Sequence, residues 1–252
     1  ESFEKNIKRA EKMAQQTGGG ILVITEGVFG MRGEQGKLKE IVALKKQYNF
    51  RLMVDDAHGF GTLGENGRGT GFEQGVQDDI DVYFATFAKS MAGIGDFLAG
   101  NKDVIQYLQY NLRSQIFAKS LPMAMVKGAL KRLDMIRTMP ELKEKLWQNT
   151  NSLQLGLRAA GFDLGSTQTC ITPVFLNGDI PEAMAMVNDL RENHGIFCSI
   201  VVYPVIPKGL IILRLIPTAT HTQQDIDETI TAFSAIREKL ENGAYKQVIL
   251  SH

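Results

Sequence analysis

Two short apolar runs, Ile21-Leu22-Val23-Ile24-Thr25 and Arg51-Leu52-Met53-Val54, enclose a helical pattern near the start of the chain. Residues 37–48, between them, repeat apolar side chains at the three- and four-residue spacing of a helix. A strand, a helix and a strand within about 30 residues form a β-α-β unit, which implies parallel pairing with a right-handed crossover. Because both runs are continuously apolar, we expect both strands to be buried on both faces.

The rest of the chain predicts two domains of different character. Residues 1–140 are expected to form an α/β domain, with part of a mostly parallel sheet flanked by helices. Residues 141–252 are expected to form a smaller α+β domain. The remaining predicted strands are 82–87, 97–100, 171–176, 197–203 and 210–216, and the remaining predicted helices are 1–16, 126–136, 140–157, 181–193 and one that starts at Thr222.

Composition excludes several classes of protein. The 252 residues carry 28 Lys+Arg and 28 Asp+Glu, so there is no basic excess and we expect no nucleic-acid partner. No apolar run approaches the ~18 residues of a membrane span, so we expect no transmembrane segment. Cys170 and Cys198 are the only cysteines, without metal-type spacing or a disulfide framework. This usage suits a reducing compartment, and we expect a cytoplasmic location and no metal.

A glycine-rich loop matches a dinucleotide-binding motif but lacks its context. Gly59-Phe60-Gly61-Thr62-Leu63-Gly64 fits G-x-G-x-x-G after a strand. A dinucleotide fingerprint must open a helix, so that amides and the helix dipole face the pyrophosphate. Residues 65–71 contain three more glycines, which is too many for a helix start. A nucleotide-binding oxidoreductase therefore stays as an alternative from another class, testable by NADH titration.

Four chemically capable side chains follow two neighbouring predicted strands. Asp55 and His58 stand three residues apart where one strand breaks into a loop, and Thr86 and Lys89 end the next strand. In open α/β sheets, ligands bind at this edge. Each residue also has a structural interpretation, since Asp caps loop amides and most lysines extend into solvent. A lysine beside a buried sheet edge can, however, be desolvated, which favours the neutral amine of a Schiff base.

One ligand accounts for all four side chains. Pyridoxal phosphate needs an amine for its aldehyde and a carboxylate that keeps its ring nitrogen protonated. It also needs a donor for its phenolic oxygen and hydroxyls for its phosphate. Separately, Arg214 interrupts an apolar strand, and an unpaired buried guanidinium is costly. Arg214 either faces solvent or binds a carboxylate, such as that of a substrate, and the pattern leaves both open.

Taken in order, these residues resemble the α-oxoamine synthases, which are fold-type-I pyridoxal phosphate enzymes. The resemblance implies that Lys89 binds the cofactor aldehyde, Asp55 pairs with the pyridinium nitrogen and His58 reaches the phenolic oxygen. It also implies that Thr86 binds the phosphate and that Arg214 binds the amino-acid carboxylate. The segments that carry the resemblance are 25–29, 54–58, 86–89, Arg214 and 218–221.

Within this family, residues 116–122 and 202–209 look most like the soluble bacterial serine palmitoyltransferases. The implied reaction condenses L-serine with palmitoyl-CoA to 3-ketodihydrosphingosine, CoA and CO₂, as in sphingolipid biosynthesis, in a homodimer with its site at the subunit interface. One alternative is 8-amino-7-oxononanoate synthase, which joins alanine to a pimeloyl thioester in biotin biosynthesis. The other is 2-amino-3-ketobutyrate CoA ligase, which uses glycine and acetyl-CoA.

The chain departs from the family pattern in several places. The family's N-terminal portion, with the histidine that stacks on the cofactor ring and a phosphate-binding loop, has no counterpart here. Gly30 stands where some members have Ser, and Asp96 and Ala118 stand where many have Gly and a hydroxyl residue. Ser120 is the available substitute for that hydroxyl, which in the family reaches the partner subunit's phosphate. We therefore expect the 252-residue chain alone to be an inactive fragment with weak or no cofactor retention.

Overall fold

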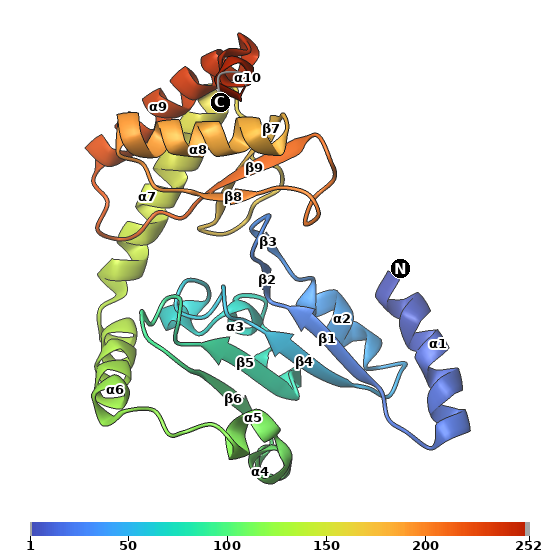
Figure 1. The fold of residues 1–252 in the computed structure, drawn as a ribbon. Coiled ribbons are helices and arrows are strands. Elements are labelled where there is room, and N and C mark those ends of the chain that lie inside the picture. Colours follow the sequence, from blue (N-terminus) through green and yellow to red (C-terminus); the bar gives the residue numbers. More distant parts are fainter. Residues whose placement is uncertain (1, 250–252) are drawn as a thin grey trace. The chain divides into compact units, whose positions relative to one another are not determined.

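The computed structural model describes residues 2–249, which form two compact units (Figure 1). The first unit contains residues 2–29 and 35–140, and the second contains residues 30–34 and 141–249. The segment 30–34 lies within the predicted first domain, yet it belongs to the second unit. The reason is local bonding, since the Gly33 carbonyl accepts hydrogen bonds from the Gln168 amide at 3.0 Å and from Thr169 Oγ1 at 3.1 Å.

The first unit is built on a four-stranded sheet with the order β1-β4-β5-β6. The β1–β4 and β4–β5 pairs are parallel and β6 is antiparallel to β5, which confirms the mostly parallel α/β sheet. Its elements are α1 (Ser2–Thr17), β1 (Leu22–Glu26), β2 (Val28–Phe29), β3 (Glu34–Gln35), α2 (Leu38–Leu44), β4 (Arg51–Asp55), η1 (Glu65–Gly67), α3 (Thr70–Glu73), η2 (Gln77–Asp79), β5 (Val82–Thr86), β6 (Asp96–Gly100), α4 (Lys102–Asn111), α5 (Arg113–Ile116) and α6 (Met123–Thr138).

Only one face of β1 is buried, so the prediction of burial on both faces was wrong for this strand. Its burial alternates, leaving Leu22 54% and Ile24 60% exposed. The opposite face forms a core in which Ile7 of α1 and Leu38 of α2 pack with the sheet. A continuous apolar run shows that a strand is apolar on both sides, and it does not show whether other elements cover both sides. The β-strand residues in this core are Val23, Leu52, Val54, Tyr83 and Ala85.

A carboxylate joins the amino ends of β4 and β5. Asp81, just before β5, accepts hydrogen bonds from the Leu52 amide at 2.7 Å, from Arg51 Nη1 at 2.9 Å and from Lys45 Nζ. Burial alone would raise the pKa of Asp81, but the bonds from Lys45, the Leu52 amide and Arg51 outweigh it and hold the pKa below its ordinary value. Asp81 therefore stabilises this end of the sheet as an anion.

The second unit is a three-stranded antiparallel sheet, in the order β7-β9-β8, packed against helices. Three of its helices begin or end at the residues that the sequence predicted. Pro140 begins α7, Gly195 ends α8 at φ 67°, and Thr222 with Asp225 forms the expected capping box at the start of α9. These features confirm the smaller α+β fold. The elements are α7 (Pro140–Ala159), β7 (Thr172–Asn177), α8 (Ile180–His194), β8 (Ser199–Val201), β9 (Leu210–Leu215), α9 (Gln223–Glu241) and α10 (Ala244–Ile249).

Asp189 of α8 connects three helices of the second unit. Its carboxylate accepts hydrogen bonds from Lys239 Nζ at 2.7 Å and from Tyr245 Oη at 2.6 Å. Burial opposes its ionisation, but the bonds from Lys239, Tyr245 and Asn193 outweigh burial and lower the pKa of Asp189 to about 2. Across residues 2–249, no helix is both long enough and apolar enough to cross a membrane.

Candidate functional site

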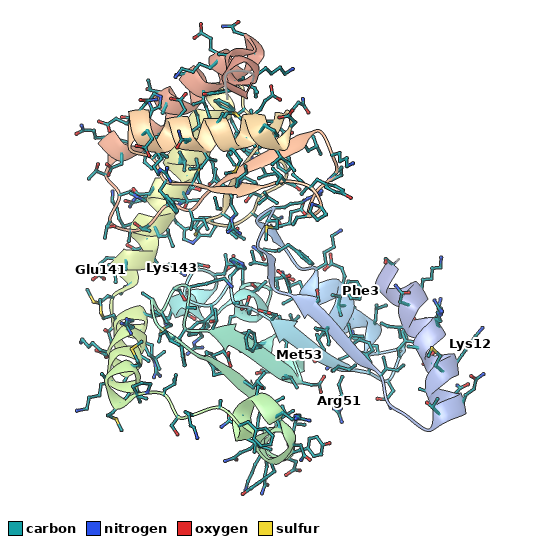
Figure 2. The ribbon with its side chains drawn as sticks, viewed as in Figure 1. Phe3, Lys12, Arg51, Met53, Glu141 and Lys143 are labelled. Atoms are coloured by element: carbon teal, nitrogen blue, oxygen red, sulfur yellow. The ribbon has the colours of Figure 1, made fainter. Side chains whose placement is uncertain are left out.

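The carboxyl ends of β4 and β5 bring the candidate residues to one edge of the first unit. Asp55 is the last residue of β4 and pairs with Phe84 of β5, and Thr86 ends β5 two residues later. Paired residues of adjacent strands, and residues two apart along a strand, point to the same face of a sheet. Asp55 and Thr86 therefore share the less buried face, with Met53 of β4, which Figure 2 labels.

Asp55 and His58 are held by a tight turn at the end of β4. Asp55 Oδ1 accepts a hydrogen bond from the Ala57 amide at 3.0 Å, so the carboxylate caps the turn and keeps a second oxygen for a ligand. The His58 carbonyl accepts a hydrogen bond from Thr62 Oγ1 at 2.9 Å, which fixes the backbone beneath the imidazole. Both side chains are partly buried, as a ligand-facing group should be.

Lys89 lies in a second tight turn after β5. Thr86 Oγ1 donates to the Gly95 carbonyl and accepts from the Ala88 amide, both at 3.1 Å, and the Ala92 amide donates to the Lys89 carbonyl at 2.9 Å. Ala92 has a φ of 42°, a left-handed conformation that is uncommon for Ala. Among residues 2–249 no hydrogen bond or ion pair engages the Lys89 amine.

Desolvation of Lys89 is not observed. The side chain is exposed, so of the two interpretations that the sequence left open for Lys89, the described chain shows the solvent-facing one. The strand before Lys89 is covered on one face only, and Lys89 follows Thr86, which lies on the less buried face. What the structure shows is a primary amine without a partner among residues 2–249, three residues after Thr86 ends β5, next to the strand that Asp55 ends.

The two other predicted residues lie elsewhere. Ser120 is exposed in the connection between α5 and α6 of the first unit. Arg214 belongs to β9 of the second unit, where its Nη1 donates to the Gly30 carbonyl at 2.7 Å and its Nε donates to Ser199 Oγ at 3.0 Å. Burial lowers the pKa of the Arg214 guanidinium, which nevertheless stays protonated near neutral pH. Of the two possibilities for Arg214, the structure shows partial burial with neutral partners.

Sequence reasoning missed a fully buried carboxylate beside Asp55. Asp56 accepts hydrogen bonds from the Thr70 amide at 2.7 Å, from Thr70 Oγ1 at 2.6 Å and from Tyr83 Oη at 2.9 Å. One feature of the sequence indicated this carboxylate: side chains alternate between the two faces along β4, which directs Asp55 and Asp56 to opposite faces. No sequence pattern could identify Thr70 and Tyr83 as the partners.

The same carboxylate explains the glycine-rich loop. A Cβ at Gly59 would overlap Asp56 Oδ1, and a Cβ at Gly69 would overlap Asp56 Oδ2, so this loop can approach the carboxylate only through glycine. Gly64 is followed by the short 3₁₀ helix η1, within which Asn66 has a φ of 52°. The glycines therefore close a loop onto Asp56 and do not open the helix that a dinucleotide site requires.

The two cysteines are part of the core, as expected. Burial raises the pKa of the Cys170 thiol to about 11, and burial raises the pKa of the Cys198 thiol to about 11. Both are therefore neutral thiols near pH 7 and poor nucleophiles.

The chain belongs to the aminotransferase class I and II family. The family described as "Aminotransferase class I and II" matches residues 1–233. Together with the mostly parallel sheet and the small antiparallel sheet, this assigns the fold-type-I α/β architecture of pyridoxal phosphate enzymes.

Within that family the relatives are α-oxoamine synthases. The chain is 74% identical over 248 residues to the cysteate-C-fatty acyltransferase of Capnocytophaga ochracea, covering 98% of the chain and 59% of the relative. It is 35% identical over 235 residues to the 8-amino-7-oxononanoate synthase of Alkaliphilus oremlandii, covering 93% and 59%. The chain thus spans about three-fifths of the length of these relatives.

A solved structure of serine palmitoyltransferase with its pyridoxal phosphate internal aldimine has the same fold. The TM-score is 0.82 at 33% sequence identity, and the match covers 87% of this chain and 55% of the solved chain. The predicted resemblance to α-oxoamine synthases and the predicted fold class are confirmed.

Proposed function

We propose that the protein is a pyridoxal phosphate-dependent C-acyltransferase that condenses an amino acid with an acyl thioester and releases CO₂. Two observations support this proposal: Asp55 and Thr86 end adjacent parallel strands, with His58 and Lys89 each three residues further along the chain, and the chain is 74% identical to an acyltransferase of this family. Residues 1–140 would be the C-terminal part of the large cofactor-binding domain and residues 141–252 the small domain.

The residues present fit the cofactor. Lys89 offers an exposed amine without a partner among residues 2–249, and Asp55 keeps one carboxylate oxygen that the turn does not use. Thr86 Oγ1 donates to the Gly95 carbonyl and accepts from the Ala88 amide, which fixes the hydroxyl at the sheet edge; to bind a phosphate oxygen it would turn its proton from Gly95 to the phosphate. Lys89 would bind the aldehyde, Asp55 the ring nitrogen, His58 the phenolic oxygen and Thr86 the phosphate, and Ser120 would reach the phosphate bound by the partner subunit.

Bound pyridoxal phosphate supplies an electron sink that stabilises negative charge at the Cα of the amino acid. Asp55, as an anion at the sheet edge, would keep the proton on the ring nitrogen. The Lys89 amine, once the amino acid has displaced it, would remove the Cα proton as a general base. In the proposed reaction, a C–C bond would form between Cα and the thioester carbonyl carbon as the CoA thiol leaves, and CO₂ would be lost from the β-keto acid with a proton returned to Cα, for which the Lys89 amine is the available donor.

Arg214 would bind the carboxylate of the amino acid. Its guanidinium is half-buried, stays charged and pairs only with the neutral Gly30 carbonyl and Ser199 hydroxyl among residues 2–249. We expect Arg214→Ala to raise the KM for the amino acid by about 10- to 100-fold with a smaller effect on kcat, because a charge-assisted bidentate contact is lost. Steady-state kinetics measure this, and an unchanged KM would remove Arg214 from substrate binding.

Cysteate is our first candidate for the amino acid. The sequence favoured serine with palmitoyl-CoA, and the 74% identity to a cysteate-C-fatty acyltransferase now favours cysteate with a fatty acyl thioester. Serine remains the second candidate, because the solved serine palmitoyltransferase superposes with a TM-score of 0.82. Alanine with a pimeloyl thioester and glycine with acetyl-CoA are the remaining pairs.

Product analysis of the full protein separates these candidates. Cysteate, serine, alanine and glycine are each incubated with palmitoyl-, pimeloyl- and acetyl-CoA, and products are identified by mass spectrometry. We expect product and CO₂ from cysteate with palmitoyl-CoA at a kcat/KM at least 10-fold above that for serine. A preference for serine would replace the substrate assignment, and no product from any pair would overturn the proposed reaction.

We also propose a homodimer. Helices α4, α5 and α6 contain no buried residue in the described chain, and they carry exposed aromatic side chains. Tyr107, Tyr110 and Phe117 are each at least 65% exposed, which is unusual for a surface that stays in water. Ser120 lies in the same segment, consistent with a hydroxyl that serves a partner subunit. Light scattering of the full protein tests this assembly.

A further inference from the structure

Asp56 is the most deeply buried ionisable residue near the candidate site. Its exposed fraction is 0%, and it follows directly after Asp55, whose side chain leaves β4 on the opposite face. Asp55 therefore points toward the candidate ligand while Asp56 points into the body of the first unit. The two adjacent carboxylates have separate environments and call for separate explanations.

The contacts of Asp56 join three segments that are far apart in sequence. Its side chain accepts three hydrogen bonds, from Thr70 at the start of α3 and from Tyr83 of β5. Its amide donates to the Phe84 carbonyl at 2.8 Å, and its carbonyl accepts from the Phe60 amide at 2.9 Å. The end of β4, the loop 59–70 and β5 are thus all connected through one residue.

Packing around the carboxylate leaves it little freedom. Gly59 and Gly69 approach so closely that a Cβ on either would overlap a carboxylate oxygen. All of its side-chain donors are neutral, and burial outweighs their hydrogen bonds and raises the pKa of Asp56. No cation among residues 2–249 bonds to this carboxylate, and an uncompensated buried carboxylate is costly, so a simple packing role does not account for it.

We propose that Asp56 is a positioning residue of the cofactor site: by anchoring the loop 59–70 and β5 to the end of β4, it fixes the backbone that presents Asp55 and His58. This inference rests on the proposed pyridoxal phosphate site. Loss of the anchor would loosen the turn 55–62, in which Asp55 caps Ala57 and His58 accepts from Thr62.

Asp56→Asn in the full protein tests the proposal, with Asp81→Asn as the matched control. Asn keeps the shape of Asp, and Asp81 also accepts three hydrogen bonds, but at the opposite end of the same strand pair. Two readouts are measured: amide hydrogen exchange of residues 55–63 in the apoprotein, and the dissociation constant of pyridoxal phosphate by absorbance titration. Thermal midpoints give the general loss of stability.

We expect Asp56→Asn to speed amide exchange in residues 55–63 at least 10-fold and to weaken pyridoxal phosphate binding at least 10-fold. Asp81→Asn should change both by less than 2-fold even where its thermal midpoint falls as far. Equal effects of the two variants, or unchanged exchange in Asp56→Asn, would overturn the positioning role. If the wild-type protein bound no pyridoxal phosphate, the proposed function would fail while the exchange result still decided the role of Asp56.

If Asp56→Asn does not fold, Tyr83→Phe provides a second test of the positioning role. It removes one of the three donors and keeps the ring in the core. We expect about a 3-fold loss of pyridoxal phosphate affinity and faster exchange in residues 55–63 at a nearly unchanged thermal midpoint. Wild-type affinity and exchange in a folded Tyr83→Phe variant would contradict the proposal.

Discussion

One aspartate stabilises each end of the β4–β5 strand pair, but the two carboxylates accept hydrogen bonds from different kinds of donor. At the amino end, Asp81 accepts from Lys45, Arg51 and the Leu52 amide, and the Arg51 side chain is 76% exposed. At the carboxyl end, Asp56 accepts only from the neutral groups of Thr70 and Tyr83 and is completely buried.

This difference follows from what each end must do. The amino end needs only to hold the sheet together, and cations on the surface compensate its carboxylate at little cost. The carboxyl end presents Asp55, Thr86 and Lys89. A cation placed there to neutralise Asp56 would also attract the Asp55 carboxylate, which the proposed site needs for its ligand. A buried carboxylate with neutral donors fixes the backbone while it leaves Asp55 and the Lys89 amine for a ligand.

The largest expected effect removes the chemistry at the carboxyl end. Lys89→Ala should lower kcat by at least about 10³-fold, because it removes the amine that we propose to bind the cofactor and to move the Cα proton. Since Lys89 is exposed, the thermal midpoint should not change. Lys12→Ala, at an exposed position of α1, is the control and should retain activity. A normal kcat in the Lys89 variant would remove this residue from the reaction.

Local sequence patterns correctly predicted secondary-structure elements of both units, including those that carry the candidate site. The β-α-β unit, the αL glycine Gly195 and the capping box at Thr222 are confirmed because each depends on neighbouring residues alone. The same reasoning brought Asp55 and Thr86 to one edge, since the carboxyl ends of adjacent parallel strands coincide.

What the sequence did not show depends on distant partners. The donors to Asp56 lie 14 and 27 residues away, and no pattern identifies Thr70 or Tyr83 as those groups. The exposed face of β1 was missed because Leu22 and Ile24 are apolar whether or not another element covers them. The exposure of Lys89 has the same cause, since burial is decided by what packs above a strand end.

Stability measurements should separate the two aspartates. Asp56→Ala should lower the free energy of unfolding by about 3 kcal/mol, because buried donors of Thr70 and Tyr83 lose their acceptor. Asp81→Ala should cost about 1 kcal/mol, because Arg51 and Lys45 can return to water. Urea unfolding followed by circular dichroism measures both. An equal or larger loss in the Asp81 variant would contradict the contrast between the ends.

The smallest expected effect is that the stability contributions of Asp81 and Asp56 change in opposite directions as the pH rises. The pKa of Asp81 is lowered on folding, so its stabilisation is present above its unfolded pKa and is lost as pH falls through the folded pKa. The pKa of Asp56 is raised, so its contribution is greatest below its unfolded pKa and decreases as pH rises through the folded pKa.

Between about pH 3 and 7, the stability cost of Asp81→Asn should therefore grow with pH, and the cost of Asp56→Asn should shrink. Urea unfolding at a series of pH values measures both slopes. Slopes of the same sign would show that the two ends do not differ in this way.

Reductive trapping of bound pyridoxal phosphate identifies the lysine that holds it. The full protein is incubated with pyridoxal phosphate and reduced with sodium borohydride, and its peptides are sequenced by mass spectrometry. We expect one phosphopyridoxyl-lysine, at Lys89, with the label reduced at least 10-fold when Asp55 is replaced by Ala. Stoichiometric label at a different lysine, or label at Lys89 that is independent of Asp55, would exclude the proposed pairing of Lys89 and Asp55 on one cofactor.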